Sequence, residues 1–310
     1  MKIIEGFETL PPASRQTAVA IGNFDGIHIG HKKILEFLSH KARQSGFISV
    51  VLTFSPHPEK ILGKKRVKMI QTMEQRLEEI EKYGIQIAFV IPFDKKFSAL
   101  SGQDFIQKIL IDSLQAKVVV VGEDFHFGRN RGGDISLLQH ISSAFGLKVF
   151  SLPSVTKDGM VVSSSLIRNL LQKGETRKAN ALLGRNYRID GKLIKEKSGR
   201  QILGFKPANI RSENEIVPPG VFITKVVHGS KVFPSLISTP HFPASNQKEI
   251  KIEAYIQNFH QNLYQKKIRI YFMKKIREKI KYGSSEDISQ QIRKNIDKAK
   301  KYFATAHPEN

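Results

Sequence analysis

The stretch "AIGNFDGIHIGH" at residues 20–31 decides the fold of the first half of the chain. A short apolar run leads into a glycine-rich turn, and two histidines, His28 and His31, follow on either side of Gly30. Glycines in such a turn let the backbone approach a ligand closely. A helix that starts here directs its first N–H groups and the positive end of its dipole at an anion. The stretch therefore predicts a strand, a tight turn and a helix start that hold a phosphate-bearing ligand.

Strand-like and helix-like segments alternate through the first half. Short apolar runs rich in β-branched residues predict strands at residues 17–22, 47–54, 85–93, 116–122 and 147–152. Helical spacing predicts helices at residues 29–46, 72–84, 101–114, 134–146 and 163–174. Thr72 and Gln75 have the spacing of a capping box at one of these helix starts. Alternation of this kind is typical of an α/β fold with a doubly wound parallel sheet.

The second half changes character near residue 185. Short strand-like runs separated by Gly, Pro, Ser or Asn are typical of a small antiparallel β-barrel. In a final segment Ile288, Ile292, Ile296 and Phe303 recur at near-helical spacing, so we expect a C-terminal helix that docks on the barrel. The chain is thus expected to form two domains, residues 1–184 and residues 185–310.

Composition limits the functional classes. The 310 residues are 40% hydrophobic and include no cysteine, which excludes disulfides and Cys-ligated metal centres. No apolar run is long enough to cross a membrane and the start lacks a secretory signal, so we expect a cytoplasmic protein. The formal net charge of +22 is compatible with a nucleic-acid partner, with an acidic small substrate, or with lysines on solvated faces. Because basic residues are spread along the whole chain, the last interpretation is favoured.

Other chemistries fit the first strand–helix junction less well. A two-histidine metal site would need a third ligand, and none is near in sequence. No G-x-x-x-x-G-K-[ST] run is present, which excludes a P-loop NTPase. No G-x-G-x-x-G follows the first strand, which argues against a dinucleotide-binding dehydrogenase.

Four ordered blocks resemble a known family. His28-Ile29-Gly30-His31 is similar to the H-x-G-H signature of nucleotidyltransferases that share their fold with class I aminoacyl-tRNA synthetases. Together with "TFSPHPEK" (53–60), "VVVGEDFHFGRNRGGD" (119–134) and "VSSSLIRNLLQKG" (162–174), it resembles the bacterial bifunctional riboflavin kinases/FAD synthetases. The resemblance implies that the first half transfers an adenylyl group from ATP to FMN, giving FAD and pyrophosphate. It also implies Mg²⁺, held largely by phosphates and water.

The resemblance implies roles for single residues on the nucleotide side. His28 and His31 are expected to contact the ATP phosphates and to stabilise charge at the reacting α-phosphorus. The residues expected to shape or close the nucleotide pocket are Gly22, Asn23, Phe24, Asp25, Gly26, Gly30, Ser163, Ser164, Ser165 and Arg168. Serine hydroxyls and a guanidinium at a helix start suit phosphate oxygens.

Two of the blocks are expected to form the flavin side of the site. The residues concerned are Phe54, Pro56, His57, Pro58, Asp124, Phe125, Phe127 and Arg131. Aromatic rings there can stack on or line the isoalloxazine, and the prolines stiffen their loop. Phe125 and Phe127 have an alternative interpretation, because residues two apart also alternate into a core. Asp124 and Arg131 favour function, since charged residues in a glycine-rich loop seldom serve packing.

The second half is similar to the riboflavin kinase module, with departures. The residues that match one family block are Leu203, Gly204, Phe205, Ala208, Asn209 and Ile210. The resemblance implies Asn209 as a metal ligand and Glu253 as the catalytic base. Lys206-Pro207 replace the family's Pro-Thr, whose hydroxyl helps to hold Mg²⁺ and ATP, and Asn258 replaces an aspartate. Because proline offers neither a hydroxyl nor a backbone donor, we hypothesise a kinase with impaired or absent activity, against an active kinase with rearranged ligands.

Two other functions stay open at this point. An RNA-binding protein is compatible with the positive charge and with a fold that also serves tRNA-charging enzymes, but no aromatic-rich RNA-recognition motif is present. A transferase that moves an adenylyl or cytidylyl group to a different phosphate is compatible with the H-x-G-H arrangement alone. The sequence favours an enzyme whose partners are a flavin and ATP, with neither a membrane nor a nucleic acid as partner.

Overall fold

The computed structural model describes residues 1–6, 16–63, 67–194, 208–239, 251–257, 265–278 and 284–306. The chain divides into two compact units, Met1–Ser164 and Ser165–Asn310. The expected domain boundary between residues 184 and 185 stays a prediction.

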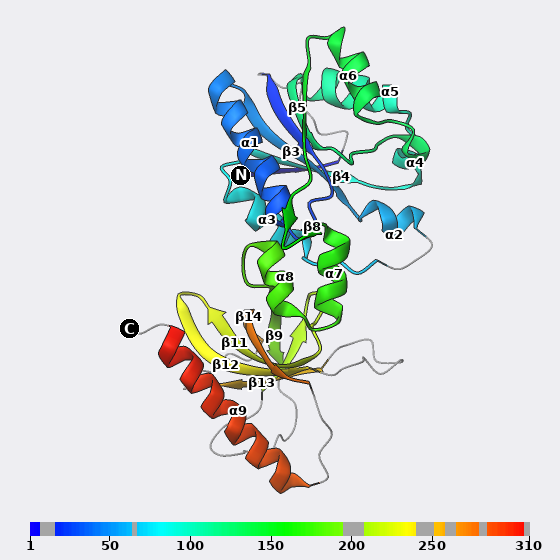
Figure 1. The fold of residues 1–310 in the computed structure, drawn as a ribbon. Helices are drawn as coiled ribbons and strands as arrows, with labels where there is room; N and C mark the ends of the chain where they lie inside the picture. The colour runs from blue at the N-terminus through cyan, green and yellow to red at the C-terminus, as the bar shows by residue number, and fades with distance from the viewer. Residues whose placement is uncertain are drawn as a thin grey trace. The chain divides into compact units, whose positions relative to one another are not determined.

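The first unit is built on a six-stranded parallel sheet, as expected (Figure 1). Its strands are β1 (Lys2–Glu5), β2 (Thr17–Ile21), β3 (Ile48–Ser55), β4 (Ile87–Pro92), β5 (Ala116–Gly122) and β6 (Lys148–Leu152). They lie in the order β1-β4-β3-β2-β5-β6. The edge strand β1 was not expected, because four residues are too few to show a period.

Helices cover both faces of this sheet (Figure 1). Helices α1 (Ile29–Ser45) and α3 (Met73–Glu81) pack on one face, against residues such as Ala18 and Ala20 of β2. On the other face, Val19 and Ile21 contact a π-helix, η1 (Phe105–Ser113), and helix α6 (Ile135–Ser143). Alternate residues of one strand thus serve two cores, which explains the continuous apolar runs. The shorter elements are α2 (Pro58–Leu62), α4 (Lys95–Ser98), α5 (Gly102–Asp104), η2 (Arg129–Arg131), β7 (Thr156–Lys157) and β8 (Met160–Val161).

The strand order places a topological switch point beside β2. Strand β2 pairs with β3 on one side and with β5 on the other, and both pairs are parallel. The chain leaves β2 for β3 and reaches β5 only after crossing to the opposite face. In open α/β sheets, ligands bind beyond the carboxyl ends of the strands at such a point. The loop after β2, which carries both histidines, lies at this position.

The second unit is a closed antiparallel barrel with a C-terminal helix, again as expected (Figure 1). Its strands are β9 (Arg188–Ile194), β10 (Ala208–Ser212), β11 (Gly220–His228), β12 (Lys231–Thr239), β13 (Lys251–Ile256) and β14 (Lys267–Arg277). They close in the order β10-β13-β12-β11-β14-β9. Helix α7 (Ser164–Gln172) begins at the last residue of the first unit, and α8 (Thr176–Leu183) leads into the barrel.

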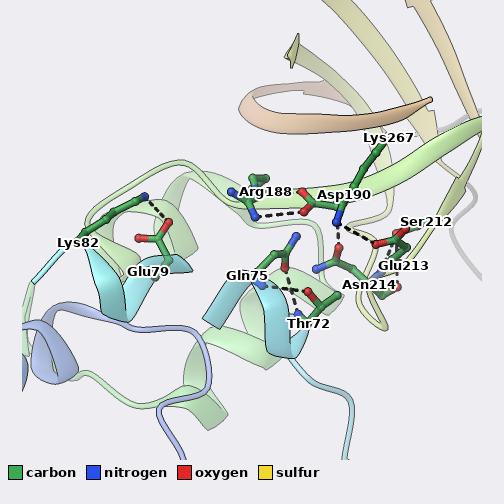
Figure 2. A network of polar contacts seen from close by, with 10 residues as sticks. All are labelled: Thr72, Gln75, Glu79, Lys82, Arg188, Asp190, Ser212, Glu213, Asn214 and Lys267. Atoms are coloured by element: carbon green, nitrogen blue, oxygen red, sulfur yellow. Dashed lines mark hydrogen bonds and ion pairs between the residues drawn. The ribbon is translucent and has the colours of Figure 1, made fainter. Parts of the chain in front are cut away.

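Polar contacts fasten the helices and strands of the second unit. The Asn180 side chain of α8 donates to the carbonyl of Phe272 at 2.9 Å and accepts from the backbone N–H of Tyr187 at 2.7 Å. Asp190 is buried in β9 and forms an ion pair with Arg188 at 2.9 Å (Figure 2). The Asn214 side chain in turn accepts from the backbone N–H of Asp190. The buried side chains of Asp190 and Asn214 are thus connected to one another and to neighbouring strands.

The C-terminal helix α9 (Ser285–Ala306) packs on the barrel through the predicted apolar face. Ile292 and Ile296 are buried against Ile223 and Leu236, and Phe303 packs beside them. The side chain of Ile288 lies outside the described residues. In the described part of the chain, no helix has the length and apolar character that a membrane crossing needs.

Candidate active site

The two histidines form a stacked pair at the start of α1. His28 is the N-cap residue, with extended backbone angles, and its Nδ1 accepts from the backbone N–H of His31 at 3.3 Å. The rings of His28 and His31 lie 3.6 Å apart between centroids and 18° from parallel. Because Nδ1 of His28 accepts, a neutral ring carries its proton on Nε2. The capping bond therefore fixes which imidazole nitrogen can donate to a ligand.

Gly30 makes this stacking possible. A Cβ at Gly30 would lie 3.2 Å from both Cε1 and Nδ1 of His28, and 3.8 Å from a methyl group of Val155. A side chain here would therefore require the His28 ring to shift by a few tenths of an ångström. The glycine of the H-x-G-H motif thus allows the His28 ring to pack closely over it.

The loop before the histidines holds strained backbone. Phe24 and Ile27 have positive φ angles of 49° and 39°, and Gly26 has a φ of 91°. The side chains of Phe24 and Ile27 are buried in the core, and the Phe24 ring meets the His31 ring edge-on at 5.2 Å. Positive φ at bulky residues persists where the surroundings enforce it, typically at functional sites. Phe24 thus supports His31 from within the core.

Asp25 holds other segments to this loop. Its carboxylate is fully buried and accepts from the backbone N–H of Ile70 at 3.1 Å and of Gln71 at 3.3 Å. Its carbonyl oxygen accepts from the Ser164 hydroxyl at 2.8 Å. The carboxylate therefore anchors the segment before α3, a contact that the sequence analysis did not predict. The predicted nucleotide contact of Asp25 stays a prediction.

The serine run spans the end of the first unit. Ser163 and Ser164 belong to that unit, and Ser164 reaches the Asp25 carbonyl. Ser165 and Arg168 lie in the first turns of α7, in the second unit. Their predicted closure over the phosphates stays a prediction.

A turn follows β3 on the expected flavin side. The Ser55–Pro56 peptide bond is cis, and Pro58 takes the first position of α2. His57 is buried and caps α2, with its Nδ1 accepting from the backbone N–H of Glu59 at 3.2 Å. The block "TFSPHPEK" thus specifies a rigid loop through its prolines and its capping histidine.

The glycine-rich loop after β5 divides its residues between core and surface. Phe127 is buried in the core, as the alternative interpretation expected, and its ring stacks on that of half-buried Phe125 at 5.3 Å. A Cβ at Gly133 would lie 2.9 Å from the Phe127 ring, so the loop closes tightly over it. Asp124 and Arg131 are exposed, and Arg131 lies 3.5 Å from Nδ1 of His126.

Six phenylalanine rings form a continuous series in the first unit. They are Phe54, Phe93, Phe97, Phe105, Phe127 and Phe125, and neighbouring ring centroids lie 5.3 to 6.3 Å apart. Phe54 and Phe125, at its two ends, come from the predicted flavin blocks. The sequence analysis missed Phe93 and Phe97, although both closely follow β4 and so lie where ligands bind in such sheets.

An acidic side chain next to the switch point holds the following loop. The hydroxyl and the backbone N–H of Ser154 hydrogen-bond to Glu123 and hold the pKa of its carboxyl below the ordinary 4.5. The next residue, Val155, is the one that approaches Gly30. Glu123 thus positions a segment that packs at the start of α1.

In the barrel, Asn209 and Glu253 form a directly opposed cross-strand pair on β10 and β13. Such partners point to the same face of a sheet, so the structure brings the predicted metal ligand and base together. Burial, and next the negative charge of Glu253, raise the pKa of Tyr255 to about 12. Leu203, Gly204, Phe205, Lys206, Pro207 and Asn258 lie outside the described residues. Among the residues that the structure describes, no group of three His, Asp or Glu side chains lies close enough together to hold a metal ion.

Comparisons with known proteins match the two halves of the chain to two different families. The family model for FAD synthetase matches residues 10–166, and the model for riboflavin kinase matches residues 183–303. A bifunctional riboflavin kinase/FMN adenylyltransferase of Buchnera aphidicola is 36% identical, over 98% of this chain and 99% of the relative. The enzyme of the same name from Haemophilus influenzae is 32% identical over 98% and 99% of the two chains. That from Escherichia coli K12 is 28% identical over 99% and 100%.

A solved structure shares the fold. A crystal structure of a macrolide-efflux protein from Streptococcus pneumoniae has a TM-score of 0.84 over 96% of this chain and 98% of the other, at 22% identity. Two family models match consecutive parts of this chain, and relatives of the same name match it over its full length. The parallel sheet and the barrel correspond to the two matched parts. The chain belongs to the family of bifunctional riboflavin kinases/FMN adenylyltransferases.

Proposed function

We propose that the first unit transfers the adenylyl group of ATP to the phosphate of FMN. An oxygen of the FMN phosphate attacks the α-phosphorus, the bond from that phosphorus to the bridging oxygen breaks, and FAD and pyrophosphate form. The observation that carries the proposal is the stacked pair of His28 and His31 at the start of α1. Their ring N–H groups suit the negative charge that grows on the phosphoryl and leaving-group oxygens.

The second substrate is a flavin. The series of phenylalanine rings offers apolar ring surfaces at its two ends, Phe54 and Phe125, which are half-buried rather than sealed in the core. Isoalloxazine rings pack well against such surfaces. One side of the proposed flavin site is the rigid loop of Pro56, His57 and Pro58. In the loop after β5, the exposed side chains of Asp124 and Arg131 can contact polar groups of the flavin.

We propose Mg²⁺ as the metal that accompanies ATP. Mg²⁺ prefers oxygen ligands and keeps several waters, so phosphates and one or two side-chain oxygens suffice. In the barrel, the amide oxygen of Asn209 is a ligand of this kind, directly across the strand pair from Glu253, the expected base. When bound, the ion neutralises phosphate charge.

A coupled measurement tests the adenylyl transfer. The purified protein with FMN, ATP and Mg²⁺ should form FAD and pyrophosphate in equal amounts. CTP in place of ATP should give no product, which separates the proposal from a cytidylyltransferase. Failure to form FAD would contradict the proposal.

We propose that the barrel phosphorylates riboflavin, with a low rate. The opposed Asn209 and Glu253 support phosphoryl transfer, whereas Lys206-Pro207 lack the hydroxyl that the family uses. Phosphoryl transfer depends on positioned, metal-assisted charge stabilisation, so the loss of one ligand should slow it. An active kinase with rearranged ligands is the alternative.

We also propose that the partners are ATP and flavins, and that the enzyme works in the cytoplasm, where ATP is made. The charge of +22 then reflects solvated lysines and some attraction of anionic substrates. RNA binding that is weak and disappears at moderate salt would agree with this. Tight, salt-resistant RNA binding without flavin binding would favour an RNA-binding protein.

A further inference from the structure

The hydroxyl group of Thr53 connects the two loops of the candidate active site. Thr53 is fully buried near the carboxyl end of β3, directly before Phe54. Its Oγ1 donates to the carbonyl oxygen of Asn23, in the histidine loop, at 3.1 Å. The same oxygen accepts from Nη1 of Arg76 at 3.4 Å. A hydroxyl has one proton to donate, so these two bonds run in a fixed direction from Arg76 through Thr53 to Asn23.

Arg76 also contacts Phe54, which belongs to the expected flavin-binding loop. Its side chain is buried, and Nη1 also donates to the carbonyl oxygen of Phe54 at 3.4 Å. Arg76 belongs to α3, whose start is fixed by the capping box of Thr72 and Gln75 (Figure 2). The residues just before that box are held by the Asp25 carboxylate. Helix α3 therefore connects to the histidine loop twice, once through Asp25 and once through Thr53.

The backbone at this point needs such support. Asn23 directly precedes Phe24, where the chain enters the segment of positive φ. The Asn23 carbonyl that accepts from Thr53 belongs to the peptide plane between these two residues. Strained backbone keeps its geometry only when its surroundings enforce it. The Thr53 hydroxyl thus fixes the peptide plane through which the strained loop departs from β2.

We infer that Thr53, supported by Arg76, is a positioning residue for adenylyl transfer that couples the flavin loop to the histidine loop. The inference rests on the proposed function of the first unit. In-line attack requires the FMN phosphate and the α-phosphorus to meet at a set distance and angle. An error of about 1 Å in such placement lowers turnover roughly 100-fold. Neither Thr53 nor Arg76 has to touch the reacting atoms for this role.

Three single variants test the inference. Thr53→Val keeps the shape of the side chain and removes the hydroxyl, and Thr53→Ser restores it. Thr17→Val is the matched control, because Thr17 is a buried threonine on the adjacent strand whose hydroxyl donates to the Leu114 carbonyl at 2.7 Å, at the other end of the sheet. We expect Thr53→Val to lower kcat for FAD formation about 10- to 100-fold, with the KM values for FMN and ATP changed less than about threefold. Thr53→Ser and Thr17→Val should keep kcat within about threefold of the wild type, although both valine variants melt earlier.

Two further measurements keep the outcome decisive. Arg76→Met should also lower kcat, and the double variant Thr53→Val/Arg76→Met should lose less than the product of the two single losses, because the two variants remove the same hydrogen bond between Arg76 and Thr53. The imidazole NMR signals of His28 and His31 should shift in Thr53→Val and not in Thr17→Val, and this readout needs no turnover. Any one of four results would overturn the inference. They are a wild-type kcat in Thr53→Val, equal losses of kcat in the two valine variants, a loss in the double variant equal to the product of the single losses, and unshifted imidazole signals in Thr53→Val. A wild-type protein that forms no FAD would count against the proposed function, while the imidazole signals would still decide the role of Thr53.

Discussion

At the scale of single residues, His28 has two separable tasks. Its Nδ1 caps α1, and the rest of its ring stacks on His31, where both can face a phosphate. Asparagine is also a good N-cap residue but has no imidazole. We therefore expect His28→Asn to lower the rate of FAD formation at least about 100-fold, as the loss of one oxyanion donor does, while Tm stays unchanged.

The corresponding alanine variant separates the two tasks. His28→Ala should lose activity to the same degree and also lose about 1 kcal/mol of stability, since the cap is removed. His31→Ala should lose activity without the capping loss. Rates of FAD formation and thermal melting curves measure both effects. Wild-type turnover in His28→Asn would contradict the assignment.

Gly30 gives a second prediction at this scale. In Gly30→Ala the new methyl group would lie 3.2 Å from the His28 ring, so the ring must move. Alanine favours a helix over glycine by about 1 kcal/mol, which should offset much of the strain. We expect nearly unchanged Tm and at least about a tenfold lower kcat, because the displaced ring places its N–H donor less well for the phosphate. Lys33→Ala, on the exposed side of α1, is the control and should behave like the wild type. A fully active Gly30→Ala variant would show that the stacking is dispensable.

At the scale of elements, the loop that follows β6 depends on an ionised carboxylate. The pKa of Glu123 is lowered by Ser154, so the contact is present above the ordinary pKa of 4.5 and is lost as the pH falls through the lowered value. The amide NMR signal of Ser154 should therefore stay constant above pH 4.5 and change below it. Glu123→Gln should abolish this transition. A transition centred above pH 4.5 would contradict the contact.

Helix α9 allows a stability prediction for the barrel. Ile296 is buried against the barrel wall, so Ile296→Ala should lower the free energy of unfolding by roughly 2–5 kcal/mol. Lys294→Ala, on the exposed face of the same helix, should change it by less than about 0.5 kcal/mol. Denaturant unfolding curves measure both. Equal stability of the two variants would show that α9 does not support the barrel.

The sequence predicts those elements whose signal is local. Periodicity and capping residues located strands β2 to β6 of the sheet, helix α3 and the apolar face of α9. The roles of Thr53 and Arg76 could not be predicted, because their contacts join segments that are 30 and 23 residues apart. Phe93 and Phe97 were not singled out, because their place at the ligand-binding edge of the sheet follows only from the order of the strands. Gly30 was recognised from its motif, but the reason for it appears only in the stacking of the histidines.

At the scale of the whole molecule, the proposed product of the barrel is the flavin substrate of the first unit. The barrel is proposed to make FMN, and the first unit to convert it to FAD. We expect FAD formation from FMN to be faster than FMN formation from riboflavin, because Lys206-Pro207 lack a ligand that the family's kinases use. Separate assays with riboflavin and with FMN measure the two rates. Robust FMN formation at an equal or higher rate would refute the impaired kinase.

The central claim is that the first strand–helix junction holds ATP through its two imidazoles. Titration of the protein with ATP and Mg²⁺, followed by the ring NMR signals of its 10 histidines, tests this most directly. We predict that the signals of His28 and His31 shift together and saturate with ATP. If ATP leaves both signals unshifted while the protein still forms FAD, the account is contradicted.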